Sequence, residues 1–340
     1  MNITFLLGNG FDIGLGLKTR YEDFYKQYTK ISSADSEIII NFKNDLLNED
    51  LNYSKEIVDW SDFEKAFGQY SKNFSVDTKA DYLKCFEDFV TKFNVYLEQE
   101  EKKVDFSDTN SIIQTMFNAV TTYFHIREGD KEFIQSLYTP IANGRIYNFI
   151  SYNYTKTVDE CANLLKQHLK SDKVRSVGKI LHIHGFIEEN MIMGVNDKSQ
   201  ITNPVLADDN AVSRELVKPI QNIDMRTNYE KQVIETINRS DIICIYGMSI
   251  GETDKKWWSI IGEWLVEKEK HALVILKYDD DYDKRFSFNQ NKFTDEITDR
   301  FLTLAGQSSD IKINVNSKIF VGMNHNVFTM NLCKEKKEVQ

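Results

Sequence analysis

The feature that most constrains the fold of this chain is a series of short apolar runs separated by longer segments of helical pattern. The runs cover residues 3–8, 145–153, 179–186, 191–195, 241–249, 271–278 and 318–322. Strands that alternate with helices predict an α/β fold with an open, mostly parallel sheet. Ligands of such sheets bind beyond the carboxyl ends of the strands. The residues that follow each run are therefore the first candidates for a site.

A long stretch of helical pattern separates the first predicted strand from the second. It is rich in Lys, Glu, Asp, Phe and Tyr, and its apolar residues recur at helical spacing. The clearest stripe consists of Tyr82, Phe86, Phe89, Phe93 and Leu97. One crossover between parallel strands needs far fewer residues. We therefore predict an inserted helical subdomain over 21–139, with 1–20 and 140–330 forming the sheet domain.

Composition narrows the class of protein. The 340-residue chain carries a formal net charge of −10, which disfavours nucleic acid or an anionic membrane as its main partner. The four cysteines fall in no metal-ligand spacing, so we expect reduced thiols and no zinc site. No stretch approaches the roughly 18 apolar residues of a membrane span, and the N-terminal run is too short for a signal peptide. These features predict a cytoplasmic protein.

The first strand ends in GNGFDIGLG. Gly8 and Gly10 would let the chain turn sharply and bring backbone N–H groups against a phosphate. The third glycine comes one position late for GxGxxG, no helical pattern starts at once, and no acidic residue ends a second strand about 20 positions on. A hydride-transfer site is therefore disfavoured. A phosphate-binding turn and a plain structural turn both stay open.

Two later strand ends carry an amide and two histidines. Asn153 ends the run in SYNYTKT, where it could serve a site or cap the following helix. His182 and His184 in LHIHGF would point to the same face of a strand. No third ligand at matching spacing follows, which disfavours a metal pair. His184, beside Gly185, has the more open position, and His182 is the better candidate for packing.

The strand end GMSIGETD resembles the G-x-S-x-G turn of serine hydrolases, with a strand before it and a helical pattern after it. Ser249 would be the nucleophile, and His325 could serve as its base because the histidine of that fold follows the serine. A serine hydrolase is therefore an open alternative. Trp60 and Glu64 in WSDFE could reach a site from the helical segment, although helix packing is the favoured interpretation.

Together these stretches resemble AbiH, the bacteriophage abortive-infection family, itself similar to sirtuin-like NAD-consuming proteins. The matching stretches are LLGNGFDIGLGLKTRYEDFY, VDWSDFEKAF, ISYNYTKTVDE, LHIHG followed by MIMGVND, and IYGMSIGETDKKWW. The resemblance implies a Rossmann-like, sirtuin-like sheet that binds NAD+ without a metal. The zinc module of sirtuins has no counterpart here, which disfavours protein deacylation. Where sirtuins have the sequence GAG in the turn after the first strand, this chain has GNG.

The resemblance also implies roles for individual residues. His184 would be the general base, and Asn153 would position ribose or water. The implied nucleotide-binding residues are Gly8, Asn9, Gly10, Phe11, Asp12, Tyr154, Gly247, Ser249 and Asp254.

The leading hypothesis is an NAD+ glycohydrolase of antiphage defence, which cleaves NAD+ to nicotinamide and ADP-ribose. We expect a phage-derived trigger and a homo-oligomer. The alternatives are a module that senses NAD+ or ADP-ribose without turnover and the serine hydrolase built on Ser249.

Overall fold

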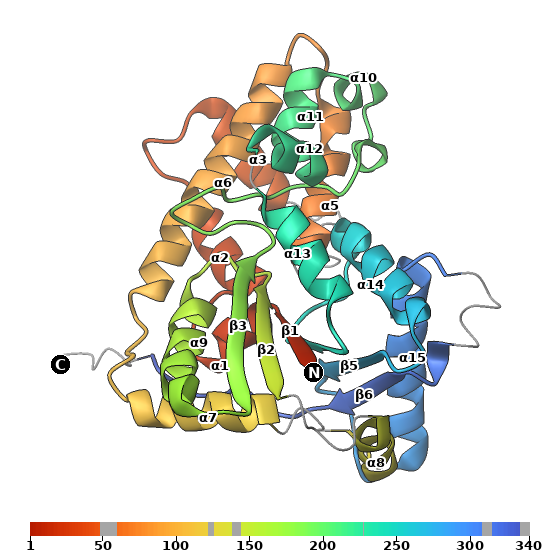
Figure 1. Cartoon of the computed structure of the whole chain (residues 1–340). Helices are drawn as coiled ribbons and strands as arrows, with labels where there is room; N and C mark the ends of the chain where they lie inside the picture. Colours follow the sequence, from red (N-terminus) through yellow and green to blue (C-terminus); the bar gives the residue numbers. More distant parts are fainter. Residues whose placement is uncertain (48–59, 122–125, 138–143, 227, 308–314, 334–340) are drawn as a thin grey trace.

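The computed structural model describes residues 1–47, 60–121, 126–137, 144–226, 228–307 and 315–333 (Figure 1). Six strands form one parallel sheet in the order β3-β2-β1-β4-β5-β6. The strands are β1 (Asn2–Leu7), β2 (Arg145–Ser151), β3 (Arg175–His182), β4 (Ile242–Tyr246), β5 (Ala272–Lys277) and β6 (Ile319–Met323). The prediction of an α/β fold with a mostly parallel sheet is confirmed.

Helices cover both faces of the sheet because its strands alternate apolar side chains between two cores. One core joins residues such as Phe5 and Cys244 to α1 (Asn9–Gly14), α7 (Thr109–Thr121) and α9 (Thr157–His168). The other joins Leu6 and Ile245 to α13 (Tyr229–Asn238), α14 (Lys255–Glu267) and α15 (Ser287–Leu304). The helix α8 (Glu128–Leu137) contributes Ile134 to the first core.

A third core forms a separate helical layer, seen in the upper half of Figure 1. It contains the predicted aromatic stripe, whose members are all buried. The helices that supply this layer are α2 (Tyr21–Tyr28), α3 (Glu37–Leu47), α5 (Trp60–Tyr70), α6 (Lys79–Glu101), α10 (Pro204–Ala207), α11 (Asn210–Leu216) and α12 (Lys218–Asp224). Packing thus groups α2, α3, α5 and α6 with the later segment that holds α10, α11 and α12, whereas the sequence predicts one insertion over 21–139.

Two local predictions are wrong. A helix does start directly after the first strand, because α1 begins at Asn9. Residues 191–195 form no strand. Met193 and Val195 are buried in the helical layer, and Gly194 takes a φ of +138° with the Leu216 carbonyl where a Cβ would lie. The run is apolar because it packs among helices.

The strand register brings the predicted site segments to one edge. Leu7 pairs with Ser151 on one side and with Tyr246 on the other, and Ser151 pairs with His182. These residues end or nearly end their strands, so the segments that begin at Gly8, Tyr152, Ile183 and Gly247 leave the sheet at one level.

Candidate functional site

Asp12 lies in a polar cluster between the ends of β1 and β2. Its side chain is buried, and Oδ2 accepts a hydrogen bond from Thr155 Oγ1 at 2.7 Å while Oδ1 accepts one from Thr157 Oγ1 at 2.5 Å. Burial raises the pKa of Asp12 to about 6, although both threonine hydroxyls act to lower it. Its two oxygens are therefore used inside the protein.

Asn153 belongs to the same cluster. Its Nδ2 donates to the carbonyl of Gly8 at 3.1 Å, and its backbone N–H donates to Ser151 Oγ. This amide therefore ties the end of β2 to the turn after β1. His182 lies beside it, with Nδ1 3.1 Å from the Asn153 carbonyl and Nε2 2.6 Å from Asp159 Oδ2. Both ring nitrogens of His182 have protein partners, as expected of a packed residue.

Gly10, in the first turn of α1, allows this helix to approach the loop after β4 closely. Gly10 N donates to the carbonyl of Gly247 at 2.8 Å, and a Cβ added to Gly10 would lie 2.4 Å from Gly247 Cα. Gly247 itself has a φ of +65°, which side chains other than glycine rarely adopt. Asn9 bonds to Thr19, and Phe11 is buried against Phe328. Contact between the first turn of α1 and the loop after β4 explains both glycines.

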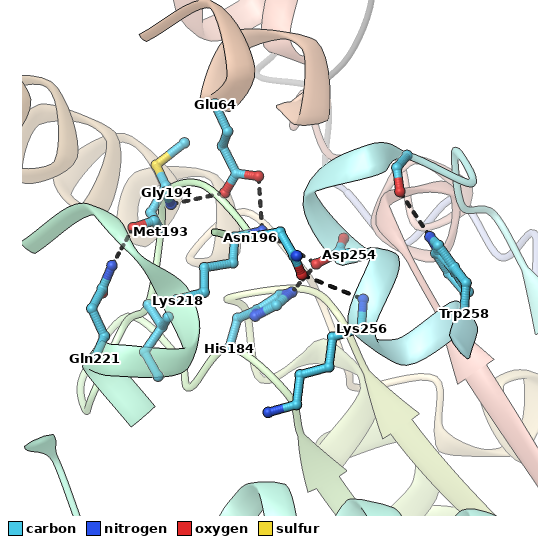
Figure 2. Close-up of polar contacts among 12 residues, drawn as sticks. Glu64, His184, Met193, Gly194, Asn196, Lys218, Gln221, Asp254, Lys256 and Trp258 are labelled. Atoms are coloured by element: carbon cyan, nitrogen blue, oxygen red, sulfur yellow. Dashed lines mark hydrogen bonds and ion pairs between the residues drawn. The ribbon is translucent and has the colours of Figure 1, made fainter. Parts of the chain in front are cut away.

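A second polar cluster joins the end of β3 to the segment after β4. His184 Nε2 lies 3.0 Å from Asp254 Oδ1 (Figure 2). The histidine is buried, with a side chain that is only 7% exposed. Burial, with the nearby Lys218 cation, lowers the pKa of His184 below its ordinary value even though Asp254 acts to raise it. The imidazole is therefore neutral at pH 7. Since a carboxylate only accepts, Nε2 carries the proton and Nδ1 keeps a lone pair.

Two residues of the helical layer complete this cluster. Lys218 Nζ lies 3.2 Å from Asp254 Oδ1 and 2.8 Å from Glu64 Oε2, while Glu64 Oε1 accepts from Gly194 N. Burial disfavours the charged form of each of these groups. The two carboxylates nevertheless raise the pKa of Lys218 above its ordinary value. Lys218, together with His184, holds the pKa of Asp254 well below its usual range. The pKa of Glu64 is raised by burial and by Asp254. Lys218 and Asp254 thus form a buried ion pair.

A small pocket of about 10 Å³ lies against this cluster. Its lining consists of His184, Asn196, Lys218, Pro219, Asn222, Glu230, Thr253, Asp254, Lys256 and Trp257. In the described part of the chain, two of these residues have a buried polar atom without a hydrogen bond, His184 Nδ1 and Asn222 Oδ1. The volume matches one water molecule. Among all the residues that the structure describes, no group of three His, Cys, Asp or Glu side chains is arranged to hold a metal ion.

Of the other site residues predicted from sequence, Tyr154 and Asp254 lie near His184, whereas Ser249 bonds to no histidine that the structure describes. Tyr154 lies near His184, with ring centroids 6.4 Å apart, and its hydroxyl donates to the Ile192 carbonyl. Ser249 is half-buried, and none of the hydrogen bonds among described residues joins it to a histidine. Asp254, assigned from sequence to the nucleotide, contacts His184. The side chain of Trp60 lies outside the described residues.

Sequence reasoning missed part of the second cluster. Glu64 had helix packing as its favoured role, yet its carboxylate faces Lys218. Lys218 and Asn222 were not candidates, because a lysine before proline and an asparagine on a short helix carry no recognisable signal. Only the fold places them beside His184.

The fold and this cluster define a parallel α/β protein with a buried histidine–aspartate pair at the carboxyl edge of its sheet. A family model described as "Bacteriophage abortive infection AbiH" matches residues 4–278. The match covers well over half of the chain, which therefore belongs to the AbiH family and to phage abortive-infection defence. A search of curated proteins returned no match. Of the helices in the described ranges, none is long and apolar enough to cross a membrane.

Proposed function

We propose that this AbiH protein cleaves NAD+ or a close relative at its N-glycosidic bond, with His184 as general base and Asp254 as the residue that orients it. The observation that carries the proposal is the neutral, buried imidazole whose Nε2 is fixed by a carboxylate while Nδ1 has no hydrogen bond to any residue that the structure describes. A histidine held in one tautomer by an acid is a common arrangement for proton abstraction.

The fold supports a nucleotide as the substrate. The strand order 3-2-1-4-5-6 is that of the dinucleotide-binding α/β fold, where the ligand lies outside the carboxyl ends near the point at which the order reverses. In this chain that point lies between β1 and β4. The His184 cluster is built at the same edge, and its Asp254 comes from the segment that follows β4. The resemblance of the strand-end motifs to sirtuin-like NAD-consuming proteins agrees with this placement.

The chemistry suits the residues. Nicotinamide leaves NAD+ as a neutral molecule, so the protein needs no strong acid for the leaving group. It needs a base for the attacking oxygen and a site that stabilises an oxocarbenium-like sugar, as in glycoside hydrolysis. His184 meets the first need. Asn153 acts in this proposal as a positioning residue, because its amide holds the carbonyl of Gly8.

The pocket beside His184 is far too small for a nucleotide, so we propose that the structure represents a resting form. Contacts between the helical layer and the segment after β4 keep it closed. They include the Lys218–Asp254 ion pair and an exposed pair, Lys65–Glu252, at 2.6 Å. A defence enzyme that depletes a nucleotide must stay inactive in healthy cells. A trigger that separates these contacts would open the site.

The test is to incubate the purified protein with NAD+, with and without extract of phage-infected cells, and to follow nicotinamide release. We expect release only with the infected extract, and loss of at least about a hundredfold in His184→Asn and Asp254→Asn. The exposed His168 supplies a matched control, since His168→Asn should behave as wild type. Tight binding of NAD+ without release would instead favour the sensing module. Equal release by wild type and His184→Asn would refute the assignment of the base.

A further inference from the structure

The pocket beside His184 has about the volume of one water molecule, and two of the residues that line it each have a buried acceptor atom without a hydrogen bond among the described residues. A buried water needs about 10–15 Å³ of such space and two to four polar partners. The pocket measures about 10 Å³, and His184 and Asn222 both line it. In each of these side chains one polar atom is buried and has no hydrogen bond among the described residues.

The orientation of Asn222 follows from its other contact. Its Nδ2 donates to the carbonyl of Lys218 at 3.2 Å, one turn earlier in α12. A carbonyl only accepts, so the amide nitrogen must face it, and Oδ1 is the free acceptor. His184 is in the same situation, because its Nε2–H donates a hydrogen bond to Asp254 and Nδ1 is left as an acceptor. Each unpaired atom therefore calls for a donor, and water supplies two.

We propose that this pocket binds the water molecule that attacks the substrate, held by His184 Nδ1 and Asn222 Oδ1. This inference rests on the proposed function and specifies its nucleophile. A water that donates both hydrogens to these atoms keeps its lone pairs free for the sugar carbon. Asn222 is thus a further catalytic residue, since it touches a reacting atom.

The step balances without a further reactant. The water oxygen forms a bond to the anomeric carbon of the ribose, and the electron pair of the breaking C–N bond goes to the nicotinamide nitrogen. One water proton passes to His184 Nδ1 and from there to solvent. The products are ADP-ribose and nicotinamide. A fixed water predicts hydrolysis rather than cyclisation.

The first test needs no activity. A high-resolution crystal structure of the wild-type protein should show an ordered water about 2.7–3.2 Å from both His184 Nδ1 and Asn222 Oδ1. Nitrogen NMR of His184 should show the tautomer with hydrogen on Nε2. A dry pocket, or a proton on Nδ1, would overturn the water site even if the protein cleaves NAD+.

The second test measures the reaction. Asn222→Leu keeps the approximate shape of the side chain but removes the acceptor, and we expect kcat to fall roughly tenfold or more with KM for NAD+ nearly unchanged. Asn222→Asp keeps an acceptor and should retain most of kcat. Equal kcat in wild type and Asn222→Leu would overturn the role of Asn222. Failure of the wild type to cleave NAD+ under any condition would instead refute the proposed function.

Discussion

Two polar clusters lie at the same edge of the sheet, and they differ in how their polar atoms are used. The β1–β2 cluster comprises Gly8, Asp12, Asn153, Thr155 and Thr157. Both oxygens of Asp12 accept hydrogen bonds from threonines, and the Asn153 amide holds the carbonyl of Gly8. The contacts of this cluster connect one strand end to the next.

The β3–β4 cluster comprises Glu64, His184, Lys218, Asn222 and Asp254. It contains a buried ion pair, a neutral histidine and two acceptor atoms without partners in the described structure. Unpaired buried polar atoms are costly and rare. The comparison teaches that the polar atoms of the first cluster are used in contacts within the protein, whereas the second cluster leaves two acceptor atoms without partners among the described residues. Of the five nucleotide-binding residues expected from GNGFD, Gly8 and Asp12 belong to this first cluster.

Lys218→Met should have the largest effect on stability. The lysine lies between two buried carboxylates, and its removal would leave both without a counter-ion. Breaking a buried ion pair from one side typically costs about 3–5 kcal/mol. We expect urea unfolding at pH 7 to show a loss of this size in the free energy of unfolding.

The exposed pair Lys65–Glu252 provides the control for that measurement. Lys65 is about two-fifths exposed, so Lys65→Met should cost no more than about 1 kcal/mol. The double variant Glu64→Gln/Lys218→Met should recover part of the loss, since one carboxylate charge is removed as well. A cost below 1 kcal/mol for Lys218→Met alone would show that the cluster is not a charged unit.

Asp12 should make the β1–β2 cluster sensitive to pH. Its folded pKa of about 6 lies above its ordinary value of 3.8, so the folded state binds the proton more tightly than the unfolded state. The stability that this proton supplies is fully present below pH 4 and is lost as pH rises through 6. Two units of pKa correspond to about 3 kcal/mol.

Asp12→Asn tests this directly, because the amide is neutral at every pH and has nearly the same shape. We expect the variant to lose the fall in unfolding free energy between pH 4 and pH 6 and to be at least as stable as wild type at pH 7. It should also keep any NAD+ cleavage, in contrast to His184→Asn. Loss of cleavage in a stable Asp12→Asn protein would assign this residue to the site.

Gly10→Ala should be destabilising by about 1–3 kcal/mol, because its Cβ would lie 2.4 Å from the backbone of Gly247. Gly129 is the matched control. It is exposed in α8 with nothing within 4 Å of its Cβ position, so Gly129→Ala should stabilise the protein by up to about 1 kcal/mol. Thermal unfolding of both variants measures the difference. An unchanged Gly10→Ala protein would mean that the start of α1 and the loop after β4 can separate freely.

The sheet could be predicted because its strands are covered on both faces. Strands such as 242–246 are buried at every position, so they read as continuous apolar runs. The run at 191–195 looks the same for another reason, since Met193 and Val195 pack among helices. An apolar run indicates that its side chains are buried, but it does not indicate whether a sheet or a layer of helices buries them. The prediction of a strand at 191–195 is wrong for this reason.

The site could be predicted only as far as strand ends allow. His184 and Asp254 follow β3 and β4, and parallel strands bring such segments to one edge. Lys218, Asn222 and Glu64 come from helices of the third core, and no spacing in the sequence relates them to His184. Their position depends on how the helical layer packs. That arrangement follows from tertiary contacts between segments more than 100 residues apart.

Tyr152→Phe should have the smallest effect on the free energy of unfolding, and it tests how far the β3–β4 cluster extends. The hydroxyl of Tyr152 is buried without a hydrogen bond among the described residues, while its ring stacks on Trp258 and meets the His184 ring edge-on. Removing an unsatisfied hydroxyl while keeping the ring should leave the unfolding free energy unchanged or raise it by up to about 1 kcal/mol. The matched control is Tyr28→Phe, which removes a 2.9 Å hydrogen bond to Asp88 and should cost about 1 kcal/mol. If Tyr152→Phe is the more costly of the two, its hydroxyl has a bound partner. The pocket site would then extend from His184 to the end of β2, because the ring of Tyr152 already contacts that histidine.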